Sequence, residues 1–209
     1  MSRLLPIALL ACLTLPVGAE TTTSTQAAVA GAAEATESAR PMPPHRIVRQ
    51  GVDRLVGFLI GASDDRPDAL QVFLDQTIAP HFDFAYMSRW AAGPLYRRLD
   101  NGQRTALESK LEISFMGALA RNLGSFTRPI PRIDVFRTRP GQRRGEARVP
   151  VRVVTDAGQI MRLEFRFYWS TSGWKIYDVT ANGASAVAFY REYFGEMLRR
   201  RGPDALKSG

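Results

Sequence analysis

The chain has 209 residues, a single cysteine and a formal net charge of +8 at pH 7. One cysteine excludes an internal disulfide and any metal site built from several cysteines, and the length allows one ordinary domain once unstructured ends are set aside. The charge favours an anionic partner, although arginine on solvated surfaces accounts for it equally well.

The N-terminus is typical of a cleaved signal peptide. Arg3 precedes an apolar run over residues 4–17, and the small residues that follow suit cleavage after Ala19. The run is shorter than the roughly 20 residues of a spanning helix. An alternative interpretation makes Cys12 the lipidated first residue of a lipoprotein. Cleavage after Ala19 would remove Arg3 and lower the net charge from +8 to +7. Export would separate the protein from nucleic acid, so nucleic acid is not an expected partner.

Residues 20–44 are rich in Thr, Ala and Pro and contain no aromatic residue. Such a segment cannot bury enough apolar surface to fold, so we expect a flexible leader. The folded domain is expected over residues 45–209.

The first half of this domain is predicted to be helical. Val48, Val52, Leu55 and Leu59 fall on one stripe of an amphipathic helix, and residues 68–78 repeat this pattern before Pro80 ends it. A short apolar piece covers residues 82–90. A longer helix is expected from Asn101 to about residues 124–126.

The second half changes to the alternation of strands. Apolar and polar residues alternate over 146–153 and again over 161–169, which predicts antiparallel strands with one dry face. Residues 133–138 are expected as an edge strand and 174–180 as a further strand. Pro150 lacks an N–H, so its strand is placed near an edge or a bulge. Ser185 is the expected N-cap of a closing helix.

These elements predict an α+β fold, with N-terminal helices, a curved antiparallel sheet of about four strands and a C-terminal helix enclosing an apolar cavity. The expected lining of this cavity consists of large apolar side chains from both halves of the domain. They are Phe82, Phe84, Met87, Trp90, Phe115, Val149, Val151, Val153, Leu163, Phe165, Phe167, Trp174, Ile176, Val187 and Tyr190. A filled core explains the same pattern, so composition leaves both interpretations open.

Motifs for catalysis or cofactor binding are missing from the sequence. It contains no G-x-S-x-G, H-E-x-x-H, G-x-x-x-x-G-K-[ST] or G-x-G-x-x-G pattern. His45 and His81 have no partners at metal-ligand spacing, so we expect no metal and no cofactor. Asp83 and Asp178 are the carboxylates most suited to act as a general base, and each also suits a structural role as a cap or acceptor.

Two blocks of sequence carry a recognisable order of motifs. W-K-I-Y-D-V at residues 174–179 leads through N-G-A-S at 182–185 to F-Y-R-E-Y-F at 189–194. Upstream, F-D-F at 82–84 is followed by M-S at 87–88, Gly93, Y-R at 96–97 and Q-R at 103–104. In their order and spacing these blocks resemble the MlaC (toluene-tolerance) family of periplasmic phospholipid-binding proteins. Tyr96 stands where the family usually has Trp, and Ala184 and Ala186 replace bulkier apolar residues.

The resemblance implies a periplasmic carrier that holds phospholipid acyl chains and shuttles lipid between an outer-membrane lipoprotein complex and an inner-membrane ABC transporter complex. It further implies a role in the lipid asymmetry of the outer membrane. We expect a monomer and no enzymatic activity. Two alternatives are a cone-shaped α+β enzyme for a small apolar substrate, with Asp83 or Asp178 as base, and a non-catalytic periplasmic adaptor with a filled core.

Overall fold

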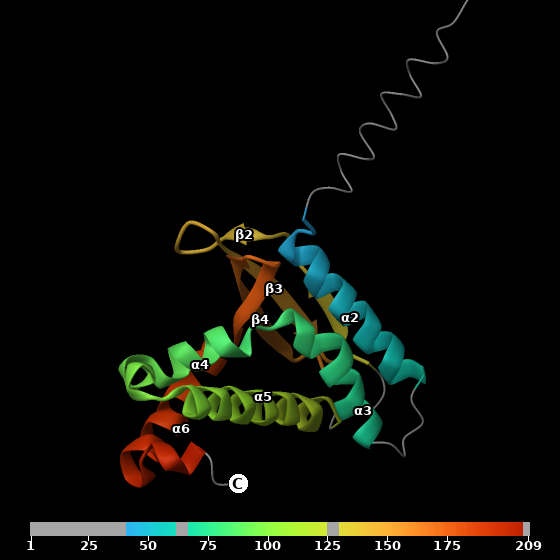
Figure 1. Ribbon diagram of the computed structural model, residues 1–209. Coiled ribbons are helices and arrows are strands. Elements are labelled where there is room, and N and C mark those ends of the chain that lie inside the picture. The colour runs from blue at the N-terminus through green and yellow to red at the C-terminus, as the bar shows by residue number, and fades with distance from the viewer. Residues whose placement is uncertain (1–40, 62–66, 125–129, 207–209) are drawn as a thin grey trace, which may run out of the picture. The chain divides into compact units, whose positions relative to one another are not determined.

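The computed structural model describes residues 41–61, 67–124 and 130–206 (Figure 1). The predicted signal peptide, Cys12 and nearly all of the predicted leader lie outside these ranges, so the assignments made for them stay predictions. The described residues belong to one unit, Pro41–Gly209. None of the helices in these ranges has both the length and the apolar character to cross a bilayer.

Two helical segments come first. Helix α2 covers Pro44–Gly61, with proline at the first helical position, where a missing N–H is harmless. Helix α3 covers Pro67–Phe73 and continues without interruption as a π-helix, η1 (Leu74–Ile78), and a 3₁₀ turn, η2 (Ala79–His81). The predicted helix over 68–78 is thus present, but its second half is wound more loosely than an α-helix.

The next helices contain the centre of the hydrophobic core. Helix α4 covers Phe84–Ala92, the 3₁₀ helix η3 covers Gly93–Arg98, and α5 covers Asn101–Gly124, close to the predicted range. Met87, Leu107, Leu111 and Met116 are completely buried. Their spacing gives α4 and α5 one apolar side each, and these sides pack against each other.

The second half forms an antiparallel sheet in the order β1-β3-β4-β5-β6, with β2 also pairing with β3. The strands are β1 (Arg132–Val135), β2 (Arg139–Pro140), β3 (Glu146–Val154), β4 (Ile160–Ser170), β5 (Gly173–Ala181) and β6 (Ala184–Ser185). Helix α6 (Ala186–Arg201) and the 3₁₀ turn η4 (Pro203–Leu206) close the chain. The predicted α+β architecture is confirmed, with two short strands more than expected.

Pro150 lies in an internal strand, contrary to the expectation of an edge or a bulge. Strand β3 has β4 on one side and both β1 and β2 on the other. Pro150 faces the break between β1 and β2, where its carbonyl accepts a hydrogen bond from the N–H of Phe136 at 3.0 Å. The missing N–H therefore falls where no strand needs it.

Strand β5 contains one extra residue, Tyr177. Phe167 of β4 pairs with Ile176, but the preceding Arg166 pairs with Asp178, so the register shifts by one at this bulge. Ile176 shares the helix-facing side of the sheet with Phe167. Beyond the bulge, Val179 takes this side and Asp178 turns to the opposite one.

The helices pack against strands on either side of the central strand β4. Helix α2 packs against β1 and β3, while α4 and α6 pack against β5. Among the described residues, no helix packs closely along the central strand β4. Figure 1 shows α2 beside the sheet and α3, α4 and α5 below it.

Candidate functional site

Strand β4 carries an apolar surface that the helices cover incompletely. Met161, Leu163 and Phe165 alternate on its helix-facing side and are half-buried, whereas Phe167, next on the same side, is completely buried. Val179 of β5 pairs with Phe165 and is also half-buried. We call Met161, Leu163, Phe165 and Val179 the β4 apolar surface. It is incompletely covered because the helices pack closely on the neighbouring strands, while the stack of Tyr86 of α4 on Tyr168 lies on the other side of β4.

Aromatic side chains close the Phe167 end of this surface. Phe82 forms a parallel bridge with Ile176, the residue that pairs with Phe167. The Phe82 ring lies 5.1 Å from that of Phe115 on α5, and the Phe84 ring lies 6.1 Å from it, measured between centroids. Such tilted and edge-to-face contacts add to the stability that area burial gives. The apolar surface is therefore sealed at one end.

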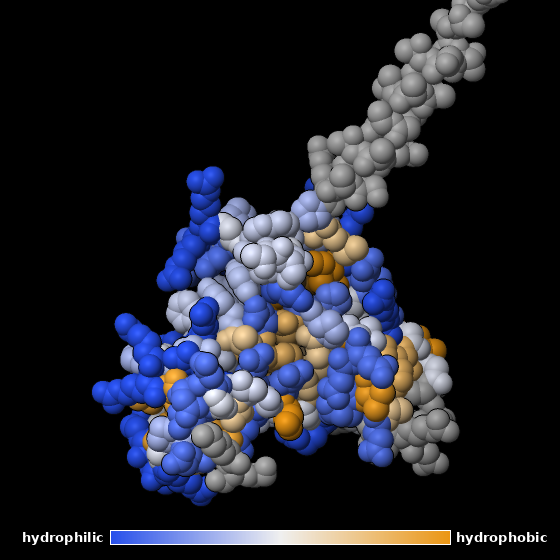
Figure 2. Space-filling model, in the orientation of Figure 1, coloured by the Kyte–Doolittle hydropathy of each residue, from blue (hydrophilic) through white to orange (hydrophobic). Residues whose placement is uncertain are grey.

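Half-buried apolar side chains also extend along the helices. Phe58 of α2 stacks on Phe73 of α3 with centroids 4.5 Å apart. Leu55, Leu119 and Leu123 belong to the same partly buried set around the core. Figure 2 shows hydrophobic residues gathered in the middle of one face, over the region between α3 and α5, with hydrophilic residues around them.

The structure divides the fifteen predicted lining residues into two groups. The larger group is fully buried in the core: Phe82, Phe84, Met87, Val149, Val151, Val153, Phe167, Ile176, Val187 and Tyr190. The smaller group is half-buried: Trp90, Phe115, Leu163, Phe165 and Trp174. Leu163, Phe165 and Phe115 are the members that lie on or beside the β4 apolar surface. The cavity itself stays a prediction.

Sequence analysis missed three residues of this region. Met161 continues the alternation of Leu163 and Phe165, so the pattern already contained it. Val179 follows the bulge in β5, which reverses the alternation and hides the residue from a period-two search. Phe58 lies beside the predicted stripe of α2, and only its contact with Phe73 reveals its place.

Asp83 is engaged in structural contacts. One carboxylate oxygen accepts a hydrogen bond from the N–H of Tyr86 at 2.8 Å, which caps α4, and the other accepts one from the hydroxyl of Tyr168. Burial and this hydrogen bond to Asp83 raise the pKa of Tyr168. The ring of Tyr86 stacks on that of Tyr168 at 4.3 Å. These contacts fix the start of α4 against β4.

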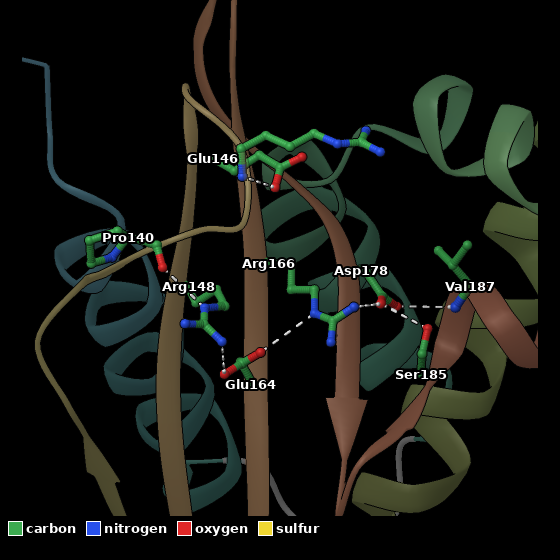
Figure 3. A network of polar contacts seen from close by, with 9 residues as sticks. Pro140, Glu146, Arg148, Glu164, Arg166, Asp178, Ser185 and Val187 are labelled. Carbon is green, nitrogen blue, oxygen red and sulfur yellow. Dashed lines mark hydrogen bonds and ion pairs between the residues drawn. The ribbon is translucent and has the colours of Figure 1, made fainter.

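Asp178 is the centre of a polar network on the other side of the sheet (Figure 3). Its carboxylate accepts hydrogen bonds from the Ser185 hydroxyl at 2.8 Å and from the Val187 N–H at 3.1 Å. Arg166 lies 3.4 Å away and also reaches Glu164 at 3.5 Å. Ser185 in turn accepts from the N–H of Ala188, as its predicted N-cap role requires. Asp178 therefore ties β5 to the start of α6.

The two histidines lie apart from one another in the structure. His45 contacts the Thr138 hydroxyl, with 2.9 Å between Nδ1 and Oγ1. His81 is half-buried, and burial lowers its pKa, with Lys175 and Arg54 lowering it further. Over the described ranges, no three His, Cys, Asp or Glu side chains group together in a way that could hold a metal ion.

Comparison with known proteins assigns the chain to a protein family. The model of the family described as MlaC protein matches residues 53–208. The chain belongs to the MlaC family. A phospholipid-binding protein from Ralstonia solanacearum, solved in complex with a phospholipid, is 20% identical, with 79% of this chain and 93% of that chain covered and a TM-score of 0.69. At this identity the likeness establishes the shared fold.

Family membership gives the two sequence blocks a structural meaning. Asp83 and Asp178 are contained in them, and both join a helix to the sheet. Arg191, from the F-Y-R-E-Y-F run, donates from Nε and Nη2 to the carbonyl of Trp90 at 2.9 and 2.8 Å, and so joins α6 to the end of α4. Tyr96 packs under the guanidinium of Arg104 at 5.0 Å. In this MlaC-family chain the motif residues hold helices in place around the β4 apolar surface.

Proposed function

We propose that the protein is a periplasmic phospholipid carrier whose β4 apolar surface contacts the acyl chains. This proposal rests on the half-burial of Leu163 and Phe165. The helices pack closely against the neighbouring strands and leave these two side chains partly exposed. Hydrocarbon between this surface and the helices would replace water there. The phospholipid bound by the Ralstonia solanacearum protein, which shares the fold, supports the ligand class.

The energetics of free lipid explain why a carrier is needed. Two acyl chains carry on the order of 30 methylenes, and at about 0.8 kcal/mol each their exposure to water costs tens of kcal/mol. A protein surface that shields them lowers this barrier without any bond being made or broken. Asp83 and Asp178, the carboxylates of the enzyme alternative, are occupied by the structural contacts described above.

The ligand is tested by phospholipid bound to protein purified from cells, measured by native mass spectrometry and by extraction. Leu163→Asp and Phe165→Asp should each lower bound phospholipid about tenfold or more, because a buried carboxylate repels hydrocarbon. Ile160→Asp is the matched control, since Ile160 is exposed on the opposite side of the same strand. Equal lipid content in all three variants, each folded by circular dichroism, would contradict the site. Lipid-free wild-type protein would favour the adaptor.

The enzyme alternative has its own test. Asp83→Asn and Asp178→Asn should leave lipid transfer between vesicles unchanged wherever the variants remain folded. A turnover of a small apolar substrate that disappears in both would overturn the carrier proposal.

The proposed shuttle runs between an outer-membrane lipoprotein complex and an inner-membrane ABC transporter complex. The sequence has no nucleotide-binding loop, so direction would come from these partners or from lipid gradients, and a positive surface would steer docking. With the two complexes in separate vesicles, labelled phospholipid should move only when the protein is added. Transfer at the same rate without it would argue against a carrier.

Periplasmic location forms part of the same proposal. Cell fractionation should place the mature chain in the periplasm, and its N-terminal residue should be Glu20. A mature chain that begins at Cys12 and carries lipid would establish the lipoprotein alternative instead.

A further inference from the structure

Two hairpin turns lie side by side at the end of the sheet beyond the sealed end of the β4 apolar surface. One is the loop between β2 and β3 (residues 141–145), and the other is the turn between β4 and β5 (residues 171–172). The N–H of Trp169 donates to the carbonyl of Gly145 at 2.8 Å and joins the two. We call residues 137–145 and 169–175 the paired tips.

Hydrogen bonds hold the β4–β5 turn in one conformation. The Ser170 hydroxyl donates to the carbonyl of Gly173 at 2.7 Å and accepts from the N–H of Ser172 at 3.1 Å. Gly173 and Gly145 have φ angles of 99° and 83°, which residues with a side chain rarely adopt. The paired tips therefore present their side chains from a fixed backbone.

A tryptophan pair is exposed at these tips. Trp169 continues the row of Phe165 and Phe167 past the sealed end, and it is 47% exposed. It meets Trp174 edge to face, with 5.2 Å between the ring centroids. Indole combines an apolar ring with a polar N–H, so it is most stable where hydrocarbon meets water. Such a pair at a hairpin tip suits the headgroup level of a bilayer.

Uncompensated positive charge lies beside the tryptophan pair. Residues 137–145 contain four arginines and no acidic residue, and Figure 2 shows strongly hydrophilic side chains projecting where Figure 1 labels β2. The four are Arg137, Arg139, Arg143 and Arg144. Within the described ranges none of them forms a salt bridge. The adjoining Glu146 accepts a hydrogen bond from the backbone N–H of Arg143 at 3.2 Å. The guanidinium groups are therefore available to an anionic partner.

The shape of this end favours a flat partner. The hollow beside the tips, lined by Gly141, Gln142 and Tyr177 among others, measures about 20 Å³ and has room for a single water. It cannot receive an anchoring side chain of a partner protein, which usually fills a pocket. A bilayer needs no pocket, because its phosphates meet the arginines while the indoles enter the headgroup layer.

We propose that the paired tips dock the protein on the surface of an anionic phospholipid bilayer, through Trp169 and the arginines of residues 137–145. The contact lies on the far side of Phe167 from the β4 apolar surface. Docking at the tips leaves that surface free and requires no bound lipid, so it is independent of the proposed function.

Vesicle flotation of the mature protein tests this docking. Vesicles of phosphatidylcholine alone are compared with vesicles of phosphatidylcholine and phosphatidylglycerol with identical chains. Wild type should bind the anionic vesicles about tenfold or more tightly than the neutral ones. This binding should weaken at high salt, since exposed charges are screened.

Variants at the tips should weaken the binding. Arg139→Gln combined with Arg144→Gln should lower the affinity for anionic vesicles about 25-fold, which is about fivefold for each lost charge. Arg143 is left in place because its guanidinium lies over the ring of Trp90 at 5.5 Å. Trp169→Gln should lower the affinity about fivefold, because less apolar area enters the headgroup layer.

Matched controls remove the same groups elsewhere. Arg98→Gln combined with Arg199→Gln takes two exposed arginines from η3 and α6. Tyr193→Gln takes an exposed ring from α6. Both controls should keep wild-type binding, and circular dichroism checks that every variant is folded.

Three outcomes have distinct meanings. Equal affinity of wild type for neutral and anionic vesicles, or unchanged affinity in the folded tip variants, would overturn the docking surface. Tip variants that bind vesicles normally but lose binding to purified membrane complexes would assign the tips to an acidic protein instead. Absence of phospholipid from wild type purified from cells would contradict the proposed function alone.

Discussion

Asp178 satisfies three different donors from a nearly buried position. Its side chain is 3% exposed, and the Ser185 hydroxyl, the Val187 N–H and the Arg166 guanidinium all point at it. A carboxylate at this depth is stable only when its oxygens are hydrogen-bonded. The residue thus joins strand to helix through a single side chain.

Replacing Asp178 by Ala should therefore be costly. Its three donors would lose their acceptor at once, and we expect the free energy of unfolding to fall by about 2–4 kcal/mol. Urea denaturation followed by circular dichroism measures this loss. Asp156→Ala, in the exposed turn between β3 and β4, is the control and should cost no more than about 0.5 kcal/mol. Similar losses for both variants would mean that the network contributes little.

Glu108 should weaken the fold when it is ionised. Burial raises the pKa of its carboxyl from the ordinary 4.5, and the charges of Asp83 and Glu112 raise it further. The folded state then holds the proton to a higher pH than the unfolded state, so stability falls as the pH rises above about 4.5 and through the raised pKa. Glu108→Gln should increase the free energy of unfolding at pH 7.

The pH dependence provides the check on this prediction. The gain from Glu108→Gln should vanish well below the ordinary pKa of 4.5, where the carboxyl is protonated in both states. Denaturation curves at neutral and acidic pH measure the difference. A gain of the same size at both pH values would show a packing effect and not a titration.

At the scale of elements, the stack of Phe58 on Phe73 joins α2 to the short helix α3. Phe58→Ala should loosen α3, with a loss of about 1–2 kcal/mol in its local stability, because the pair loses both area and ring contact. Hydrogen exchange over residues 67–73 should become faster. Val72→Ala, at an exposed position of α3, should leave this exchange unchanged. Unaltered exchange in Phe58→Ala would mean that other contacts hold α3.

Periodicity in the sequence predicted the long elements well. Strand β3 alternates between buried and half-buried residues along its whole length, apolar and polar residues alternate over 161–167 of β4, and α5 begins and ends close to the predicted residues. Strands β2 and β6 have two residues each, too few for any pattern, and exist because a longer strand lies beside them. The break opposite Pro150 likewise depends on a neighbouring strand. Pairing across the chain is not contained in local periodicity.

The candidate site was predictable only in part, for a related reason. Alternation identified Leu163 and Phe165 as one side of a strand, but it does not distinguish a half-buried side chain from a buried one such as Val149. That difference depends on which helices press on which strand. The place of Val179 beside Phe165 likewise depends on the bulge in β5, which arises from strand pairing and which no motif records.

At the scale of the whole molecule, bound lipid should stabilise the folded state by mass action. A ligand at 100 times its Kd adds about 2.7 kcal/mol, which for a domain of this size raises Tm by roughly 5–10 °C. Thermal scans of lipid-loaded and detergent-stripped protein measure the shift. It should be absent in Leu163→Asp. An identical Tm with and without lipid would speak against binding to the folded state.

The bulge at Tyr177 decides on which side of the sheet a negative charge stands. If Tyr177 paired regularly with Arg166, the alternation that places Ile176 beside Phe167 would continue to Asp178 and turn its carboxylate towards the helices. Because Tyr177 is left out of the pairing, Val179 takes that place and the acid meets Arg166 on the opposite face. One unpaired residue thus keeps charge away from the surface proposed to meet hydrocarbon.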